Sequence, residues 1–95
     1  MIVVFTRAAA ADLDEILAYT SANFPDRMDA LQARLKVVID RIAKLPESAR
    51  VVEGRTTVKV VPLLRFPFKI FYRVHEDRIE ILHLHHASRD IPGFE

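Results

Sequence analysis

Three histidines lie close together near the C-terminal end of the sequence, at His83, His85 and His86. A histidine beside arginines could act as a general acid or base in RNA cleavage, because imidazole exchanges protons near neutral pH. On a strand, His83 and His85 would share one face and could ligate a metal ion. No third ligand is evident and the chain has no cysteine, so we expect no metal site. The alternative for one histidine is a half-buried structural role, which would fall to His86 if Leu82 and Leu84 face the core.

Basic residues are concentrated in the middle of the chain. Residues 49–73 contain six basic residues and one acidic residue, a net charge of +5, whereas residues 1–48 and 74–95 have net charges of −1 and −3. A basic block of this kind could contact RNA, DNA or an acidic protein segment, and an ordinary solvated face is the alternative. Arginine would stabilise charge at a phosphate. The candidates are Arg65, Arg73 and Arg89, for which surface solubility or a salt bridge, such as Arg89 with Asp90, is the alternative.

Length and composition exclude several classes of protein. The chain has 95 residues, of which 51% are hydrophobic and 28% charged, so we expect one globular domain over residues 1–95. No apolar run exceeds five residues, far short of the roughly 20 that cross a membrane. The absence of cysteine excludes thiol chemistry and fits a cytoplasmic protein. The two glycines, Gly54 and Gly93, form no phosphate-binding loop, so we expect no cofactor.

Periodicity predicts a strand and then two helices. The β-branched segment from Ile2 to Phe5 is typical of a short strand, and Thr6 is a plausible N-cap for a helix that continues to Phe24. Apolar residues recur at helical spacing over residues 31–45, and Pro46 ends this second helix. The acidic residues of the first helix, Asp12, Asp14 and Glu15, are expected on its solvent-facing side near the positive end of the helix dipole.

The second half of the chain alternates with a period of two. After a loop over residues 47–55, strands are predicted at 58–61, 66–74 and 79–87. Phe66, Phe68, Ile70, Tyr72 and Val74 should face the helices. The phase of the last strand is ambiguous, which a bulge or burial on both faces would explain.

The element order is therefore β-α-α-β-β-β, which predicts a two-layer α+β domain. A helical hairpin would cover one face of an antiparallel sheet. The other face would carry Lys59, Lys69 and Arg73 beside Val61 and Phe71. Such an open, basic and partly aromatic face suits either a functional site or a partner surface.

These residues together resemble the RelE/ParE superfamily of bacterial toxins from toxin–antitoxin pairs, also known as plasmid stabilisation proteins. The resemblance covers nearly the whole chain. The matching segments are residues 8–16, Tyr19, Pro25, Leu45-Pro46, residues 58–60, residues 66–74 and residues 81–90.

The resemblance implies a fold but leaves two targets open. ParE-like members are associated with poisoning of DNA gyrase, and RelE-like members with ribosome-dependent mRNA cleavage by basic residues and often a histidine or tyrosine. The positions that match the nuclease pattern here are Lys59, Arg65, Arg73, His86 and Arg89. No tyrosine follows the last strand, where residues 91–95 stand instead, and the net charge is only +1. Both features weaken the resemblance to the nucleases. Residues 72–74 and 86–90, at the ends of the last two strands, are closer to ParE.

The resemblance thus implies a growth-inhibiting toxin that binds gyrase and has no bond-breaking chemistry of its own. An mRNA endonuclease using Arg65, Arg73, His86 and Arg89 is the alternative, and an inactive relative that only binds its antitoxin is a third hypothesis. In each case the resemblance implies a heteromeric complex with a cognate antitoxin, which would lie over the groove between the helices and the sheet. The expected partner-binding residues are Lys59, Arg65, Lys69, Phe71 and Arg73.

Overall fold

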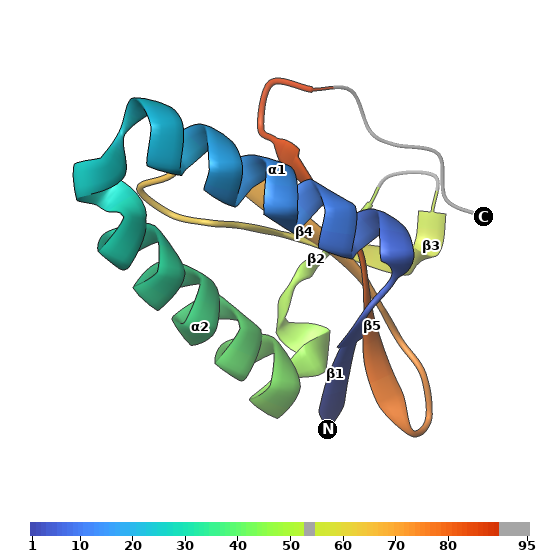
Figure 1. The fold of residues 1–95 in the computed structure, drawn as a ribbon. Coiled ribbons are helices and arrows are strands. Elements are labelled where there is room, and N and C mark those ends of the chain that lie inside the picture. Colours follow the sequence, from blue (N-terminus) through green and yellow to red (C-terminus); the bar gives the residue numbers. More distant parts are fainter. Residues whose placement is uncertain (53–54, 90–95) are drawn as a thin grey trace.

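The two helices form an open V on one side of a five-stranded sheet (Figure 1). The computed structural model describes residues 1–52 and 55–89, with the backbone alone for Arg55 and Thr56. The helical elements are α1 (Arg7–Asn23), η1 (Pro25–Arg27), α2 (Met28–Lys44) and η2 (Pro46–Ser48). The strands are β1 (Ile2–Phe5), β2 (Arg50–Val52), β3 (Arg55–Pro62), β4 (Phe68–Val74) and β5 (Arg78–His86). Neither long helix in this part of the chain has the length and hydropathy needed to cross a bilayer.

The helix boundaries follow local chemistry. Thr6 caps α1, because its side-chain oxygen accepts a hydrogen bond from the Ala9 amide at 3.0 Å. Pro25 follows α1 and Pro46 follows α2, since proline lacks the amide that would continue either helix. The predicted cap and both predicted helices are therefore confirmed.

The sheet has the strand order β1-β5-β4-β3-β2. The pairings β2–β3, β3–β4 and β4–β5 are antiparallel, whereas β1 runs parallel to β5. The predicted α+β two-layer arrangement is confirmed, with the difference that the sheet is mixed. The two helices connect β1 to β2 at the opposite edge of the sheet, and three antiparallel pairings then bring β5 beside β1. Strand β2 lies within a segment that the sequence predicts as a loop.

The main core lies between the helices and one sheet face. Its buried members are Ala9, Leu31, Leu35, Val38, Ile42, Leu63, Ile70, Tyr72, Ile79, Ile81 and Leu84. Phe66, Phe68 and Val74 pack against it, so the predicted inner face of β4 is confirmed. A smaller cluster on the other face buries Val52, Val58, Phe71 and Leu82.

The phase predicted for β3 is wrong. Lys59 lies opposite Tyr72 in the antiparallel register, and residues directly opposite share a face. Lys59 and Val61 therefore lie on the helix side, where Val61 packs against the main core. Val58 and Val60 join the outer cluster instead. The segment is apolar on both faces, so its own sequence does not determine which face is inner.

Candidate functional site

A bulge in β5 determines where the histidines lie. The β4–β5 register shifts between Phe71 and Tyr72, which pair with His83 and Ile81 and leave Leu82 as the extra residue. Before the bulge Ile81 faces the main core, and after it Leu84 does. The bulge thus resolves the ambiguous phase predicted for this strand. His83 and His85 lie on the outer face of the sheet, because they pair with Phe71 and Lys69 of β4, which face that way.

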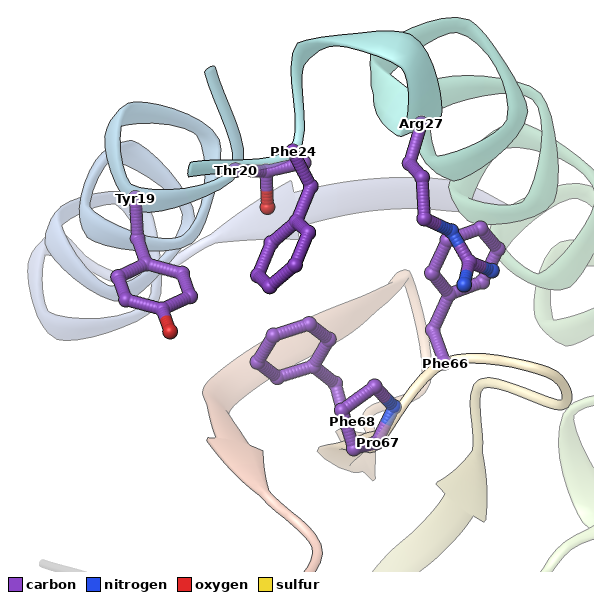
Figure 2. A pocket seen from close by; sticks show the side chains of 7 residues that line it. All are labelled: Tyr19, Thr20, Phe24, Arg27, Phe66, Pro67 and Phe68. Carbon is purple, nitrogen blue, oxygen red and sulfur yellow. The ribbon is translucent and has the colours of Figure 1, made fainter. Parts of the chain in front are cut away.

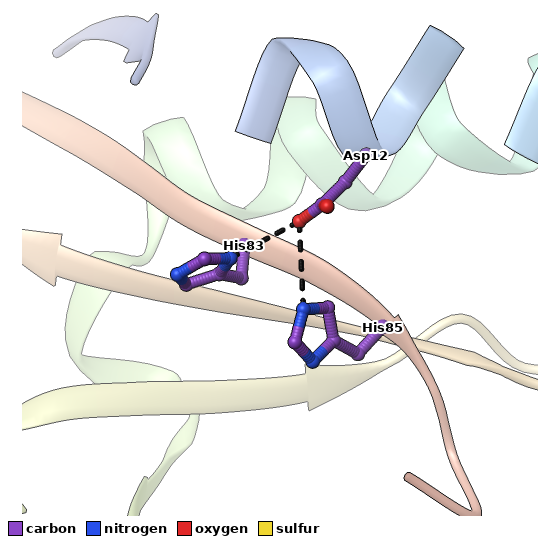
Figure 3. Close-up of side chains that lie close together, drawn as sticks. All are labelled: Asp12, His83 and His85. Carbon is purple, nitrogen blue, oxygen red and sulfur yellow. Dashed lines mark hydrogen bonds and ion pairs between the residues drawn. The ribbon is translucent and has the colours of Figure 1, made fainter. Parts of the chain in front are cut away.

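Asp12 of α1 reaches both of these histidines (Figure 3). Its Oδ2 atom lies 3.1 Å from His83 Nδ1 and 3.6 Å from His85 Nε2. The same oxygen accepts a hydrogen bond from the Leu84 amide at 3.1 Å. Strand β1 pairs with β5 only as far as Ile81, so Asp12 satisfies an amide that this edge of the sheet would otherwise leave unpaired. The prediction of a merely solvated Asp12 is therefore wrong, whereas Asp14 and Glu15 are exposed as expected.

His85 is the buried histidine, not His86 as the sequence suggests. Its side chain is 6% exposed, and the ring meets Phe71 edge-on at a centroid distance of 6.2 Å. Burial lowers the pKa of His85, and the nearby charge of Arg89 lowers it further against the opposing effect of Asp12. The ring is thus held neutral near pH 7. Its Nδ1 atom is buried without a hydrogen-bond partner in the part of the chain described.

His86 and Arg89 remain at the surface and share one pocket. The Nδ1 atom of His86 accepts a hydrogen bond from the Ser88 amide at 3.1 Å and lies 2.7 Å from the Ser88 hydroxyl. Two contacts at Nδ1 favour the tautomer with the proton on Nε2. The pocket, of about 540 Å³, is open to solvent and extends from α1 to the end of β5. It is lined by Asp12, Glu15, Ile16, Tyr19, Phe24, Pro67, Phe68, Leu84, His85, His86 and Arg89.

An adjoining apolar groove, shown in Figure 2, lies between the end of α1 and the β3–β4 connection. Its volume is about 210 Å³, and its lining is Tyr19, Thr20, Phe24, Arg27, Phe66, Pro67 and Phe68. The Arg27 guanidinium stands over the Phe66 ring at 4.7 Å. Arg27 also donates a hydrogen bond to the Arg65 carbonyl, at 3.3 Å. We call this surface the aromatic groove.

The basic residues predicted to act together are dispersed. Lys59 is largely buried on the helix side and forms an ion pair with Glu47 at 2.9 Å. Arg65 lies in the exposed β3–β4 connection, with a φ of 76° that is unusual for a residue other than glycine. Arg73 is half-buried on the outer face of β4, opposite Glu80 of β5. The structure brings His86 and Arg89 together but not Arg73.

The outer sheet face is less open than the sequence predicts. Phe71 is only 1% exposed because the outer cluster covers it. Lys69 extends over this ring at 5.4 Å and donates hydrogen bonds to the carbonyls of Ala87 and Arg89. The predicted pair of Arg89 with Asp90 and the ending at residues 91–95 lie outside the described residues.

Sequence reasoning missed Asp12 and the aromatic groove as parts of a site. Asp12 precedes His83 by 71 residues, so only the packing of α1 on the edge of β5 joins them. The groove had a weak signal. Tyr19 and Phe24 are aromatic residues near the end of a helix, and they are 58% and 52% exposed. Large exposed aromatic side chains near one another often mark a contact surface.

Comparison with known families gives a match over most of the chain. The sequence profile of the family described as "ParE toxin of type II toxin-antitoxin system, parDE" matches residues 3–91.

Individual proteins agree with this match. The chain is 35% identical over 88 residues to Y4kP of Sinorhizobium fredii, whose name describes it as a candidate toxin, and this covers 93% of the chain and 90% of that protein. It is 33% identical over 88 residues to toxin RelE2 of Caulobacter vibrioides, covering 92% and 96% respectively. A chain in the solved structure of the chromosomal ParDE TA system from P. aeruginosa has the same fold. The TM-score is 0.66 and the identity 24%, over 90% of this chain and 95% of that one.

Proposed function

Because the chain belongs to the ParE toxin family of type II toxin–antitoxin systems, we propose that it arrests bacterial growth by binding DNA gyrase and that a cognate antitoxin neutralises it. The relatives carry both ParE-type and RelE-type names, so the choice of target depends on the chemistry of the site.

The separation of Arg73 from His86 supports a binding role over cleavage of RNA. His86 lies opposite Phe68, on the helix-side face at the start of β4, whereas Arg73 lies on the outer face near the end of that strand. Arg73 is five residues after Phe68 along the strand, which is about 17 Å at 3.4 Å per residue. Groups on opposite faces at that distance cannot contact one phosphate, so the complete set of predicted catalytic residues does not form one active site.

The aromatic groove supports the antitoxin part of the proposal. It is apolar at its base, and Arg27 lies at its rim with Arg65 beside it. An amphipathic segment could bury apolar side chains between Phe24 and Phe68 and place carboxylates against these guanidinium groups. The sequence predicts that the antitoxin lies over the groove between the helices and the sheet, and the aromatic groove lies at that junction. The predicted contact residues Lys59, Lys69, Phe71 and Arg73 do not line it. Lys69 and Arg73 remain candidates for contact with the target.

The decisive test measures supercoiling by purified gyrase in the presence of the purified chain. We expect inhibition that the antitoxin relieves. In parallel, DNA and protein synthesis are followed by pulse labelling after the chain is induced alone in bacteria. Early loss of DNA synthesis with continued translation is the expected result. Unchanged supercoiling at concentrations well above those in the cell would contradict the proposal.

Ribosome-dependent mRNA cleavage is a second candidate, favoured by the shared pocket of His86 and Arg89. In that case translation would fall first, and His86→Ala or Arg89→Ala would abolish toxicity while the chain stays folded. If the gyrase proposal is correct, translation persists. The chain then has no nuclease activity for the two substitutions to remove. If neither synthesis falls in cells that express the chain well, the chain is an inactive relative.

A further inference from the structure

Asp12, His83 and His85 form a compact group of potential metal ligands. One ligand atom from each lies within 4.8 Å of the other two. The group joins two elements, since Asp12 belongs to α1 and both histidines belong to β5 (Figure 3). The proposed function assigns no role to these three residues.

The spacing of these atoms is close to that of a coordination sphere. Ligand bonds to zinc are about 2.0–2.2 Å long, so tetrahedral ligand atoms lie roughly 3.3–3.6 Å apart. Asp12 Oδ2 lies 3.1 Å from His83 Nδ1 and 3.6 Å from His85 Nε2. The two imidazole rings are tilted by 56° with centroids 4.9 Å apart. One ligand atom from each residue lies within 4.8 Å of the other two, so rotation of the side chains has to bring the two histidine nitrogens closer together around one ion.

We propose that Asp12, His83 and His85 bind a divalent transition-metal ion of the zinc class, with at least one coordination position left for solvent. Two imidazole nitrogens and one carboxylate oxygen form a ligand set that suits zinc. Harder cations such as magnesium and calcium prefer oxygen ligands, so they fit this group poorly.

Two features fix the ligand side chains in place before a metal ion binds. The Leu84 amide donates to Asp12 and fixes its carboxylate at the edge of β5, as outer hydrogen bonds fix ligands in metal proteins. His85 is 6% exposed and packs edge-on against Phe71. An orienting contact and a tightly packed ring both reduce the entropy that metal binding would have to overcome.

The burial of His85 is the independent argument for a function. Its Nδ1 atom has no hydrogen-bond partner among the described residues, and burying an unsatisfied polar atom costs free energy. A leucine would fill a similar volume without that cost. Core packing alone therefore does not require a histidine at position 85. The other ring nitrogen, Nε2, lies 3.6 Å from Asp12 Oδ2, in the position that a ligand requires.

Access to the group is through the pocket next to it. Asp12 and His85 both line the pocket of about 540 Å³, together with His86 and Arg89. Water can therefore reach the ion, and a bound metal would connect α1 to the end of β5.

The test is a titration of the purified full-length chain with zinc chloride by calorimetry, repeated with cobalt(II) and read from its visible absorption. We expect one ion per chain. His83→Gln and His85→Leu should each weaken zinc binding by more than about 100-fold, beyond the effect of losing an outer hydrogen bond. The matched control is His86→Gln, which alters a neighbouring exposed histidine and should leave the affinity unchanged.

Folding of the variants is checked by thermal unfolding without metal. His85→Leu should be at least as stable as the parent chain, because it removes a buried polar group. No saturable zinc binding by the folded parent chain would overturn the proposal. Equal affinities for the parent, His83→Gln and His85→Leu chains would overturn it as well, and so would a His86→Gln chain that loses the ion.

Discussion

Tyr72 connects the sheet to the segment that follows α2. Its hydroxyl donates a hydrogen bond of 2.6 Å to the Pro46 carbonyl, and the residue is completely buried. Burial, with a smaller contribution from the Glu47 carboxylate, raises the pKa of Tyr72 to about 12, and the Ala49 backbone opposes this rise. The unfolded chain releases the phenol proton near pH 10, which is before the folded chain does. The stabilisation by Tyr72 is therefore complete below pH 10 and is lost as the pH rises from 10 to 12.

We predict that Tyr72→Phe lowers the free energy of unfolding at pH 8 by about 1–2 kcal/mol, because it leaves a carbonyl unsatisfied. The difference between parent and variant should shrink or change sign by pH 12, since the parent loses roughly 2–3 kcal/mol over that interval. Urea denaturation of both chains at several pH values measures this difference, and ionisation of lysines cancels between them. A constant difference from pH 8 to pH 12 would contradict the assignment.

At the scale of single residues, sequence reasoning found His83 and His85 as a pair of possible ligands but not the third group. The register of β5 and the packing of α1 place Asp12 beside them, and neither is encoded near these residues. For the same reason the buried histidine was misassigned. The bulge places Leu82 and Leu84 on opposite faces of the sheet. His85 packs against Phe71 on the outer face, whereas His86 shares the helix-side face with Leu84 but lies at the exposed end of β5.

Among the elements, Thr6 has two roles at the junction of β1 and α1. Its hydroxyl accepts from the Ala9 amide at 3.0 Å and donates to the Leu82 carbonyl at 3.1 Å. We predict that Thr6→Ala destabilises the chain by about 2 kcal/mol, because it removes the N-cap and a contact to the edge of β5. Thr6→Ser is the matched control, since it keeps the hydroxyl. Midpoints of urea unfolding compare them, and equal midpoints for the two variants would refute the role of the hydroxyl.

The predictability of each element followed from how many of its faces are buried. Helix α2 and strand β4 each alternate between apolar and polar sides, so both their type and their inner face were predictable. Strand β3 is apolar on both sides, and only its register with β4 places Lys59 inside. Strand β2 has three residues and depends on β3 for its existence, so no local pattern could reveal it.

At the scale of the whole molecule, the aromatic groove and its basic rim predict where an antitoxin binds. We expect Phe24→Asp to weaken the antitoxin complex by more than about 30-fold, because loss of an aromatic anchor costs about 2 kcal/mol or more. Leu45→Asp is the control. Leu45 is 55% exposed and Phe24 is 52% exposed, but Leu45 follows the C-terminal end of α2 and lies outside the groove.

Affinities for these variants are measured by calorimetry with the purified antitoxin. Equal weakening by both substitutions would show that general charge, and not the groove, governs the complex. Equal affinities for the Phe24→Asp and parent chains would place the antitoxin elsewhere on the surface.

The parallel pairing of β1 with β5 has a consequence for how the chain is made. Residues 2–5 are synthesised well before their partners at residues 78–81. The Leu84 amide that Asp12 satisfies emerges later still. Native contacts between such distant segments form late in folding. A chain truncated before β5 therefore lacks the partner of β1 and the histidines of the neighbouring pocket, so we expect it to have none of the proposed effect on growth.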